Sequence, residues 1–292
     1  MKKLLLGNEA VARGLYEAGC RVASSYPGTP STEITEYAAK YEDIYCEWAP
    51  NEKVAMEVAC GAAIAGARSF CAMKHVGLNV ACDPLFTASY TGVNAGMVIA
   101  VADDPGMHSS QNEQDSRHHA QASKTMMLEP SDSAECLAYT KLAYELSEQF
   151  DTPVILRLST RVSHSRSLSE TAERVDNGVK DYVKDPQKYV MMPAMAKGRH
   201  VVVEERFQAE TAWAETASIN TVEYNDTSIG VIAAGISYQY AKEALGDRVS
   251  YLKLGCVYPL PVELIKEFAD KCDTVYAVSY THLRAHETTL HL

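Results

Sequence analysis

Short apolar runs alternate with longer stretches in which apolar residues recur every three or four positions over the first half of the chain. The first pattern is typical of buried strands and the second of helices that bury one face. We expect strands over 1–6, 21–25, 44–48, 69–74, 97–102 and 154–158. We expect helices over 9–18, 78–90 and 133–149, a further helix that follows the turn 26–30 and ends at 40, and one that begins at 51. Strands separated by helices predict βαβ units and therefore an α/β fold with a doubly wound, mainly parallel sheet.

The second half of the chain changes its pattern twice. From 160 to about 189 the residues are polar and without period, which predicts a long linker, followed by a helix over 203–217. Apolar runs return from Ser228 onward, with strands expected over 229–234, 249–254 and 274–278 and helices over 238–245 and 261–269. We expect a first domain over 1–165, a linker with a helix over 166–227, and a second, smaller and incomplete α/β domain over 228–278.

Residues 279–292 continue neither pattern. We interpret this segment as a non-native tail from a truncated or mis-assembled reading frame, because it interrupts a domain that has no finish. Its three histidines, His282, His286 and His291, could instead be read as metal ligands, which is the less favoured interpretation.

Composition narrows the function further. The 292 residues are 47% hydrophobic and 22% charged, as in a soluble globular protein, and the net charge of −11 would repel nucleic acid. No apolar run approaches the ~20 residues of a membrane helix. The eight cysteines form no Cys-x-x-Cys pair, so neither zinc nor an iron–sulfur cluster is supported here, and a reducing cytoplasm fits best.

Glu52 is the first candidate for chemistry. It follows the expected strand 44–48 and opens a helix rich in alanine and glycine. An ordinary acidic residue in a first helical turn would look the same. Glu57 is the other acid of this segment, but five residues turn a helix by about 140°, so it points elsewhere. Glu52 is therefore the better candidate for a carboxylate at the corner between strand and helix.

Two further polar segments follow expected strands. Thr29 lies in a Tyr-Pro-Gly-Thr-Pro turn, where a threonine N-cap with proline at the next position commonly starts a helix. Lys74 ends the expected strand over 69–74 and His75 follows it; both could reach a bound ligand, and Gly77 would allow close backbone approach. In open α/β sheets ligands collect at the carboxyl ends of strands, where both segments lie. A helix cap and a solvated surface are the structural alternatives.

A long polar loop is expected over 103–119. Such loops are often functional in compact domains, and Arg117 could clamp a substrate carboxylate with paired hydrogen bonds. A simple mobile loop is the alternative. His108, His118 and His119 have no dependable metal spacing, so we assign no metal.

Together these segments resemble the 2-oxoacid:ferredoxin oxidoreductases, and among them the alpha subunits that act on indolepyruvate. The resemblance covers roughly residues 1–278. It rests on residues 7–10, 25–31, 73–80 and 83–85 with the Glu52 helix, and is extended by 111–117, 253–255 and 258–261.

The resemblance implies a role for each candidate residue. Residues 1–165 would be the pyrimidine-binding domain for thiamin diphosphate, with Glu52 against N1′ of the aminopyrimidine as the cofactor-activating glutamate. Thr29 would lie beside cofactor and substrate, His75 and Gly77 beside the cofactor, and Arg117 on the substrate carboxylate. The block from Ser228 would be the transketolase-C-like domain.

The implied reaction is the oxidative decarboxylation of an arylpyruvate, with CoA giving an aryl-acyl-CoA and electrons passing to ferredoxin. It belongs to cytoplasmic aromatic amino-acid catabolism in anaerobes. The implied partners are a beta subunit, ferredoxin, CoA and the arylpyruvate, in a homo- or hetero-oligomer. The family's diphosphate domain, with its Mg²⁺ motif, and its [4Fe-4S] clusters do not occur in these residues. We therefore expect an N-terminal fragment that is inactive alone.

Three alternatives stay open at this point. The substrate could be pyruvate or a branched-chain 2-oxoacid, because the sequence does not reveal pocket shape. The chain could belong to a thiamin-dependent decarboxylase that needs no ferredoxin. It could also be a non-catalytic α/β assembly module whose small-residue helix serves only for packing.

Overall fold

A computed structural model describes residues 1–279, and its centre is a seven-stranded sheet. The predicted tail falls outside the described residues except for Ser279, as do its three histidines. All neighbours in this sheet are parallel except the outermost pair, so the predicted doubly wound α/β fold is confirmed. In spatial order the strands are β12 (Cys256–Tyr258), β6 (Met127–Leu128), β7 (Val154–Ser159), β5 (Met97–Asp103), β4 (Ser69–Lys74), β2 (Val22–Ser25) and β3 (Tyr45–Trp48).

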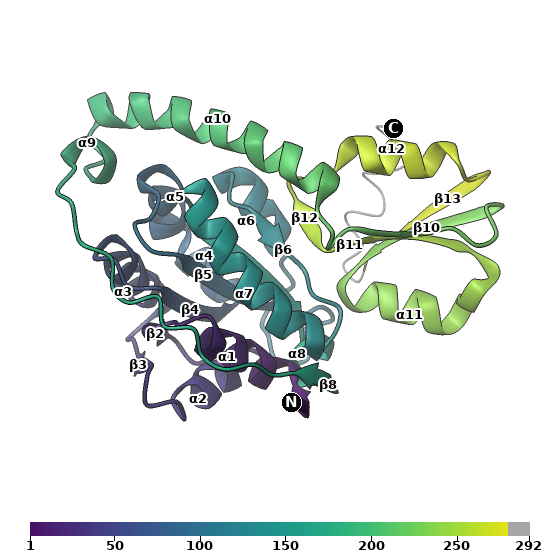
Figure 1. The fold of residues 1–292 in the computed structure, drawn as a ribbon, viewed down its shortest axis with the longest axis horizontal. Helices are drawn as coiled ribbons and strands as arrows, with labels where there is room; N and C mark the ends of the chain where they lie inside the picture. The colour runs from purple at the N-terminus through teal and green to yellow at the C-terminus, as the bar shows by residue number, and fades with distance from the viewer. Residues whose placement is uncertain (280–292) are drawn as a thin grey trace.

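Helices cover both faces of this sheet (Figure 1). Successive strand residues point to opposite faces, so Phe70 and Ala72 join one apolar core while Cys71 and Met73 join the other. The first core packs under α1 (Gly7–Glu17), α2 (Thr32–Ala38) and α7 (Ser133–Phe150). The second packs under α3 (Glu52–Ile64), α4 (His75–Val80), α5 (Cys82–Thr91) and α6 (Ser116–Ser123). The expected single helix over 78–90 is thus two helices.

The predicted linker is ordered and docked. Its first part forms β8 (Arg166–Glu170), which pairs antiparallel with β1 (Lys2–Leu6) in a separate two-stranded sheet and follows the short helix α8 (Thr160–His164). Residues 171–185, which we call the strap, run without regular structure along the first unit to α9 (Pro186–Tyr189). The strap amides of Val175 and Lys180 donate to the carbonyls of Glu17 and Gly66 at 2.9 and 2.8 Å.

Helix α10 (Pro193–Thr216) connects the two ends of the molecule, as Figure 1 shows. It begins ten residues before the expected helix over 203–217. Its buried residues are Val203, Arg206, Glu210 and Ala214, all after its first ten residues. None of the first ten residues is fully buried, so they carry no apolar period that would have predicted this part of the helix.

A second, four-stranded sheet lies beyond α10. Its order is β13 (Thr274–Val278), β10 (Ile229–Ala234), β11 (Ser250–Leu254) and β9 (Thr221–Glu223), with α11 (Gly235–Leu245), a 3₁₀ turn (Gly246–Arg248) and α12 (Val262–Asp270). Strand β9 precedes the expected start at Ser228, and β12 leaves this unit to pair with β6 of the large sheet. The expected division into domains stays a prediction. Strand β9 lies in the expected linker but pairs in the second sheet, and β12 lies in the expected second domain but pairs in the first sheet.

No helix among residues 1–279 combines the length and the apolar character that crossing a membrane would require.

Two buried ionisable residues, Arg206 and Glu210, lie on the inner face of α10. Arg206 donates to the carbonyl and the hydroxyl of Ser89 at 2.8 and 3.2 Å. Glu210 is fully buried, and within the described residues neither of its carboxylate oxygens accepts a hydrogen bond. Arg206 Nε is 3.7 Å from Glu210 Oε1, too far for a good hydrogen bond. Burial therefore dominates and raises the pKa of Glu210 to about 7.

Replacing Glu210 with glutamine should change how stability depends on pH. The folded carboxyl holds its proton up to about pH 7, against an ordinary pKa of 4.5, so the wild type loses stability as pH rises between these values. The loss should be on the order of 3 kcal/mol and absent in Glu210→Gln. Urea unfolding at pH 5 and pH 8 measures it, with Glu205→Gln, an exposed position on the same helix, as control. Parallel pH curves for wild type and Glu210→Gln would contradict this assignment.

Docking of the strap against the first unit should require glycine at position 66. Its φ is +98°, and a Cβ there would overlap the carbonyl of Lys180. Gly66→Ala should therefore lower the free energy of unfolding by about 1–3 kcal/mol from the backbone conformation alone. Gly61→Ala is the matched control, because a Cβ there meets nothing within 4 Å inside the exposed part of α3. The control should gain about 0.5–1 kcal/mol from helix propensity, and equal urea midpoints for the two variants would exclude the strap contact.

Candidate cofactor site at the strand ends

The carboxyl ends of four parallel strands meet at one edge of the large sheet. The register aligns Ser25 at the end of β2 with Trp48 at the end of β3 and with Ala72 near the end of β4, and Lys74 with Ala102 of β5. The segments that follow these strands therefore lie together: the turn at 26–31, the start of α3, the start of α4 and the loop 104–115. This edge is where ligands bind in open α/β sheets.

Glu52 opens α3, as predicted. The preceding Asn51 caps the helix, its side-chain oxygen accepting from the amide of Val54 at 3.0 Å. Glu52 is half-buried, and it has no hydrogen-bond or ion-pair partner within the described part of the chain. Glu57 instead has a side chain 51% exposed, 4.0 Å from Lys53. Of the two acids, only Glu52 is both partly buried and without an ion-pair partner among the described residues.

Gly77 in α4 holds the space that Glu52 uses. An ideal Cβ on Gly77 would lie 2.6 Å from Glu52 Oε1 and 2.7 Å from its Cγ. Real Cβ atoms do not approach other atoms so closely, so any side chain at 77 would push the Glu52 carboxylate away. Gly77 was expected to allow a ligand to approach the backbone closely. In this structure the group beside Gly77 is the Glu52 carboxylate, and the expected contact of Gly77 with a cofactor stays a prediction.

The buried side chain of His75 holds the loop 104–115 through two hydrogen bonds to its backbone. The ring is fully buried, and Nδ1 accepts from the amide of Asp104 at 3.2 Å. Nε2 must then carry the proton and donate to the carbonyl of Asn112 at 2.9 Å. Both ring nitrogens are thus taken by loop backbone. The expected contact of His75 with a cofactor stays a prediction.

Thr29 lies in the turn after β2, but it does not cap a helix, so that expectation was wrong. Helix α2 begins at Thr32 with Ser31 as its N-cap. The amide and the hydroxyl of Ser31 both donate to the carbonyl of Gly28 at 2.8 Å, and this turn delays the helix. Thr29 is exposed at the strand-end edge, and its hydroxyl makes no hydrogen bond within the described residues.

Arg117 lies in α6 and not in a loop, which corrects the expected loop over 103–119. Asp115 caps α6, so the helix begins at Ser116. Arg117 is 4% exposed and donates through Nε and Nη2 to both oxygens of Asp115 at 2.7–2.9 Å, and through Nη2 to the hydroxyl of Ser279 at 3.0 Å. Its expected contact with a substrate carboxylate stays a prediction, and Asp115 would compete for the same donors.

A buried ionic network continues from this pair to the centre of the sheet. Arg157 of β7 is 2.9 Å from Asp103, 2.8 Å from Glu129 and 3.7 Å from Asp115. Burial alone would lower the pKa of Arg157, but the three carboxylates raise it above its ordinary value. The same arginines hold the pKa of Asp115 well below its usual range against the effect of burial. Sequence reasoning missed this network, although an arginine inside the apolar run Val154–Ser159 was the signal for it.

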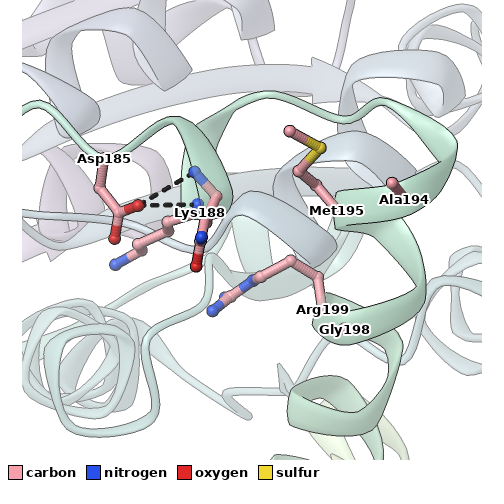
Figure 2. Close-up of a pocket in the computed structure, with 7 residues that line it drawn as sticks. Asp185, Lys188, Ala194, Met195, Gly198 and Arg199 are labelled. Carbon is pink, nitrogen blue, oxygen red and sulfur yellow. Dashed lines mark hydrogen bonds between the residues drawn. The ribbon is translucent and has the colours of Figure 1, made fainter.

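A cavity of about 570 Å³ lies elsewhere, between α9 and α10 (Figure 2). Asp185 accepts from the amides of Gln187 and Lys188 at 3.0 and 3.2 Å and so caps α9. Lys188 and Arg199 pair with Asp151 at 2.8 and 3.2 Å. No lining residue of this cavity comes from the strand-end segments, and its two cations share the carboxylate of Asp151.

Comparison with known proteins identifies relatives along most of the chain. The family described as "Pyruvate flavodoxin/ferredoxin oxidoreductase, thiamine diP-bdg" matches residues 13–230. Indolepyruvate oxidoreductase subunit IorA of Methanothermobacter marburgensis is 47% identical over 283 residues, which cover 94% of this chain and 46% of that protein. The same subunit of Archaeoglobus fulgidus is 42% identical over 289 residues, covering 95% and 46%. The chain thus spans about half the length of these relatives.

A solved structure has the same fold. The 2-oxoglutarate:ferredoxin oxidoreductase from Magnetococcus marinus, with 2-oxoglutarate, coenzyme A and succinyl-CoA bound, aligns with a TM-score of 0.80. The alignment covers 99% of this chain and 60% of that one at 18% sequence identity, so it supports the fold and not a function.

Arg157→Met should destabilise the protein strongly. The substitution keeps the buried volume but leaves the carboxylates of Asp103 and Glu129 without their cation. Breaking a buried ion pair in this way costs about 3–5 kcal/mol, measurable as a lower urea midpoint. Arg161→Met is the control, because Arg161 is exposed in α8 and should change stability by about 0.5 kcal/mol or less. A loss at Arg157 no larger than at Arg161 would show that the network contributes nothing.

Proposed function

The chain belongs to the pyruvate flavodoxin/ferredoxin oxidoreductase family of thiamine diphosphate-binding proteins, and we propose that it is the cofactor-activating half of a subunit that oxidatively decarboxylates indolepyruvate and other arylpyruvates. The observation that carries the proposal is the uncommitted Glu52 carboxylate, seated against the bare α-carbon of Gly77 at the ligand-binding edge. The IorA names of relatives at 42–47% identity support the aryl substrate.

The residues at this edge fit thiamin diphosphate. A half-buried carboxylate with no protein partner is a group that a ligand would have to satisfy, and Glu52 is such a group. Glu52 would hold the aminopyrimidine ring at N1′, Gly77 would keep that carboxylate in position, and Thr29 would lie beside the thiazolium and the substrate. When bound, thiamin diphosphate would supply a carbon acid whose deprotonated form can add to the oxo carbon and hold the electron pair that stays behind when CO₂ leaves.

Glu52 has one chemical task in this proposal, the transfer of a proton at N1′. No cation of the described residues lies within ion-pair distance of it, so its carboxylate is not neutralised before the ring arrives. Its position at the first turn of α3 also fixes its direction, because Asn51 caps that turn. A positioned carboxyl that shares a proton in this way acts as a general acid and base.

The remaining parts of the reaction lie beyond these residues in the proposal. Because the relatives are about twice as long, we assign the diphosphate and Mg²⁺ contacts and the [4Fe-4S] clusters to the rest of the subunit. A beta subunit, CoA and ferredoxin would complete a cytoplasmic oligomer. Residues 1–165 would be the pyrimidine domain and those from 228 the transketolase-C-like domain. Turnover by residues 1–292 alone is not expected.

Glu52→Gln tests the proposal in the full-length subunit assembled with its beta partner. Indolepyruvate-dependent reduction of ferredoxin should fall by about 10²–10⁴-fold, the contribution of a positioned acid–base group. Gly77→Ala should also reduce the rate, since it displaces the same carboxylate without removing it. Glu57→Gln and Gly61→Ala are the matched controls and should stay within about twofold.

The outcomes separate the alternatives. Full activity of Glu52→Gln would exclude the cofactor role. Calorimetric titration with thiamin diphosphate that shows no binding to the wild type would leave the assembly module as the function. Faster turnover of pyruvate than of indolepyruvate would move the substrate assignment to the smaller 2-oxoacids.

A further inference from the structure

Two cations lie close to the candidate cofactor site, and their partners differ. Arg117 is buried and gives three donor contacts to Asp115, which also lies 3.7 Å from Arg157. The pKa of Asp115 is held well below its usual range, so the carboxylate is ionised and keeps these partners. To bind a substrate carboxylate, Arg117 would have to give up its contacts with Asp115 and leave that buried carboxylate with Arg157 at 3.7 Å as its nearest other cation, which is costly.

Lys74 has no such commitment. It is the last residue of β4, and its alkyl stem crosses the α-carbon of Gly28, where an ideal Cβ would lie 3.3 Å from Lys74 Cγ. The stem thus lies beside the turn that carries Thr29. The ammonium donates only to neutral oxygens, the carbonyl of Ser109 at 3.1 Å and the hydroxyl of Ser110 at 3.3 Å. No carboxylate among residues 1–279 lies within 4 Å of it.

Asp104 is the acid nearest to Lys74 along these hydrogen bonds, and other groups already bond to its carboxylate. Asp104 accepts from the amide of Ser109 at 2.7 Å and from the hydroxyl of Thr160 at 2.8 Å. The hydroxyl of Ser110 also bonds to it, and so stands between Asp104 and Lys74. Burial alone would raise the pKa of Asp104, but these hydrogen bonds lower it below its ordinary value. Asp104 orders the loop, and the Lys74 charge stays available.

We propose that Lys74, and not Arg117, receives the carboxylate of the 2-oxoacid. The inference rests on the proposed function, since it requires the substrate to react at this edge. In a 2-oxoacid the carboxylate is bonded to the oxo carbon that reacts. A cation must therefore lie beside the reacting position, between the Thr29 turn and the Glu52–Gly77 contact. Lys74 ends the strand whose next helix contains Gly77, and its stem touches the Thr29 turn.

The neutral partners of Lys74 suit a carboxylate that is lost in the reaction. When CO₂ leaves, the cation loses its counter-charge in a partly buried place. Ser109 and Ser110 can then take back the ammonium, as they hold it in this structure. A flexible ammonium can move between the two sets of partners more easily than a planar guanidinium fixed by a bidentate pair.

The test compares two inhibitors that differ only in charge, on the assembled full-length enzyme with thiamin diphosphate. Indole-3-propionate carries the carboxylate and indole-3-propionamide does not, and neither can be decarboxylated to product. Calorimetry should show that the wild type prefers the carboxylate. In Lys74→Met, which keeps the stem over Gly28, the carboxylate should bind about 10- to 100-fold more weakly while the amide changes by less than about threefold.

Lys74→Gln separates charge from loop anchoring, because its amide still donates to Ser109. If Lys74 binds the substrate, Gln and Met should lose the preference for the carboxylate equally, and KM for indolepyruvate should rise more than kcat falls. If Lys74 only anchors the loop, Gln should behave as wild type and Met should weaken both inhibitors alike, which would overturn the inference. Retained preference in Lys74→Met would also overturn it. An inactive wild type, or a fully active Glu52→Gln, would instead refute the proposed function.

Discussion

The Glu52 side chain occupies the space that a side chain at position 77 would fill. The candidate site depends on this steric constraint, because Glu52 can lie there only while residue 77 is glycine. Two helices that follow different strands must approach closely enough for the carboxylate of one to rest on the α-carbon of the other. The parallel register of β3, β2 and β4 brings their ends level, and Asn51 fixes the first turn of α3. A sheet shifted by one residue would separate the two groups.

The end of β4 organises the remaining parts of this edge. Lys74 reaches the turn after β2 and the loop after β5, His75 holds both ends of that loop, and Gly77 admits Glu52. Three residues within positions 74–77 therefore contact three neighbouring segments. Because His75 uses both ring nitrogens for backbone, the loop position depends on a neutral ring and not on a charge.

Much of this could be predicted from the sequence. Strands β4, β10 and β13 have the bounds that their apolar runs indicated, and the family resemblance is confirmed by the matches over most of the chain. Glu52 and Gly77 were each named from local motifs and not from any period, but their contact with each other was not predicted. What could not be predicted depends on contacts between distant residues. The partner of Arg117 lies two residues away but is chosen by the turn of α6, and the Arg157 network joins three separate segments.

Short strands were missed for a related reason. β6 has two residues and β12 has three, too few to show an alternation, and only their pairing defines them. The mostly polar side chains of the strap indicate a linker, although its backbone is hydrogen-bonded along the first unit. The sequence predicts α10 too short because no residue of its first ten is fully buried.

Strand β12 has a consequence for how the polypeptide can be divided. It comes from the second unit yet closes the border of the large sheet against β6. A shortened polypeptide that stops before residue 256 would expose the amides and carbonyls of β6 as a template for intermolecular pairing. Such a piece should self-associate rather than behave as an autonomous module. The two halves also cannot swing apart as rigid bodies without breaking the pairing between β6 and β12.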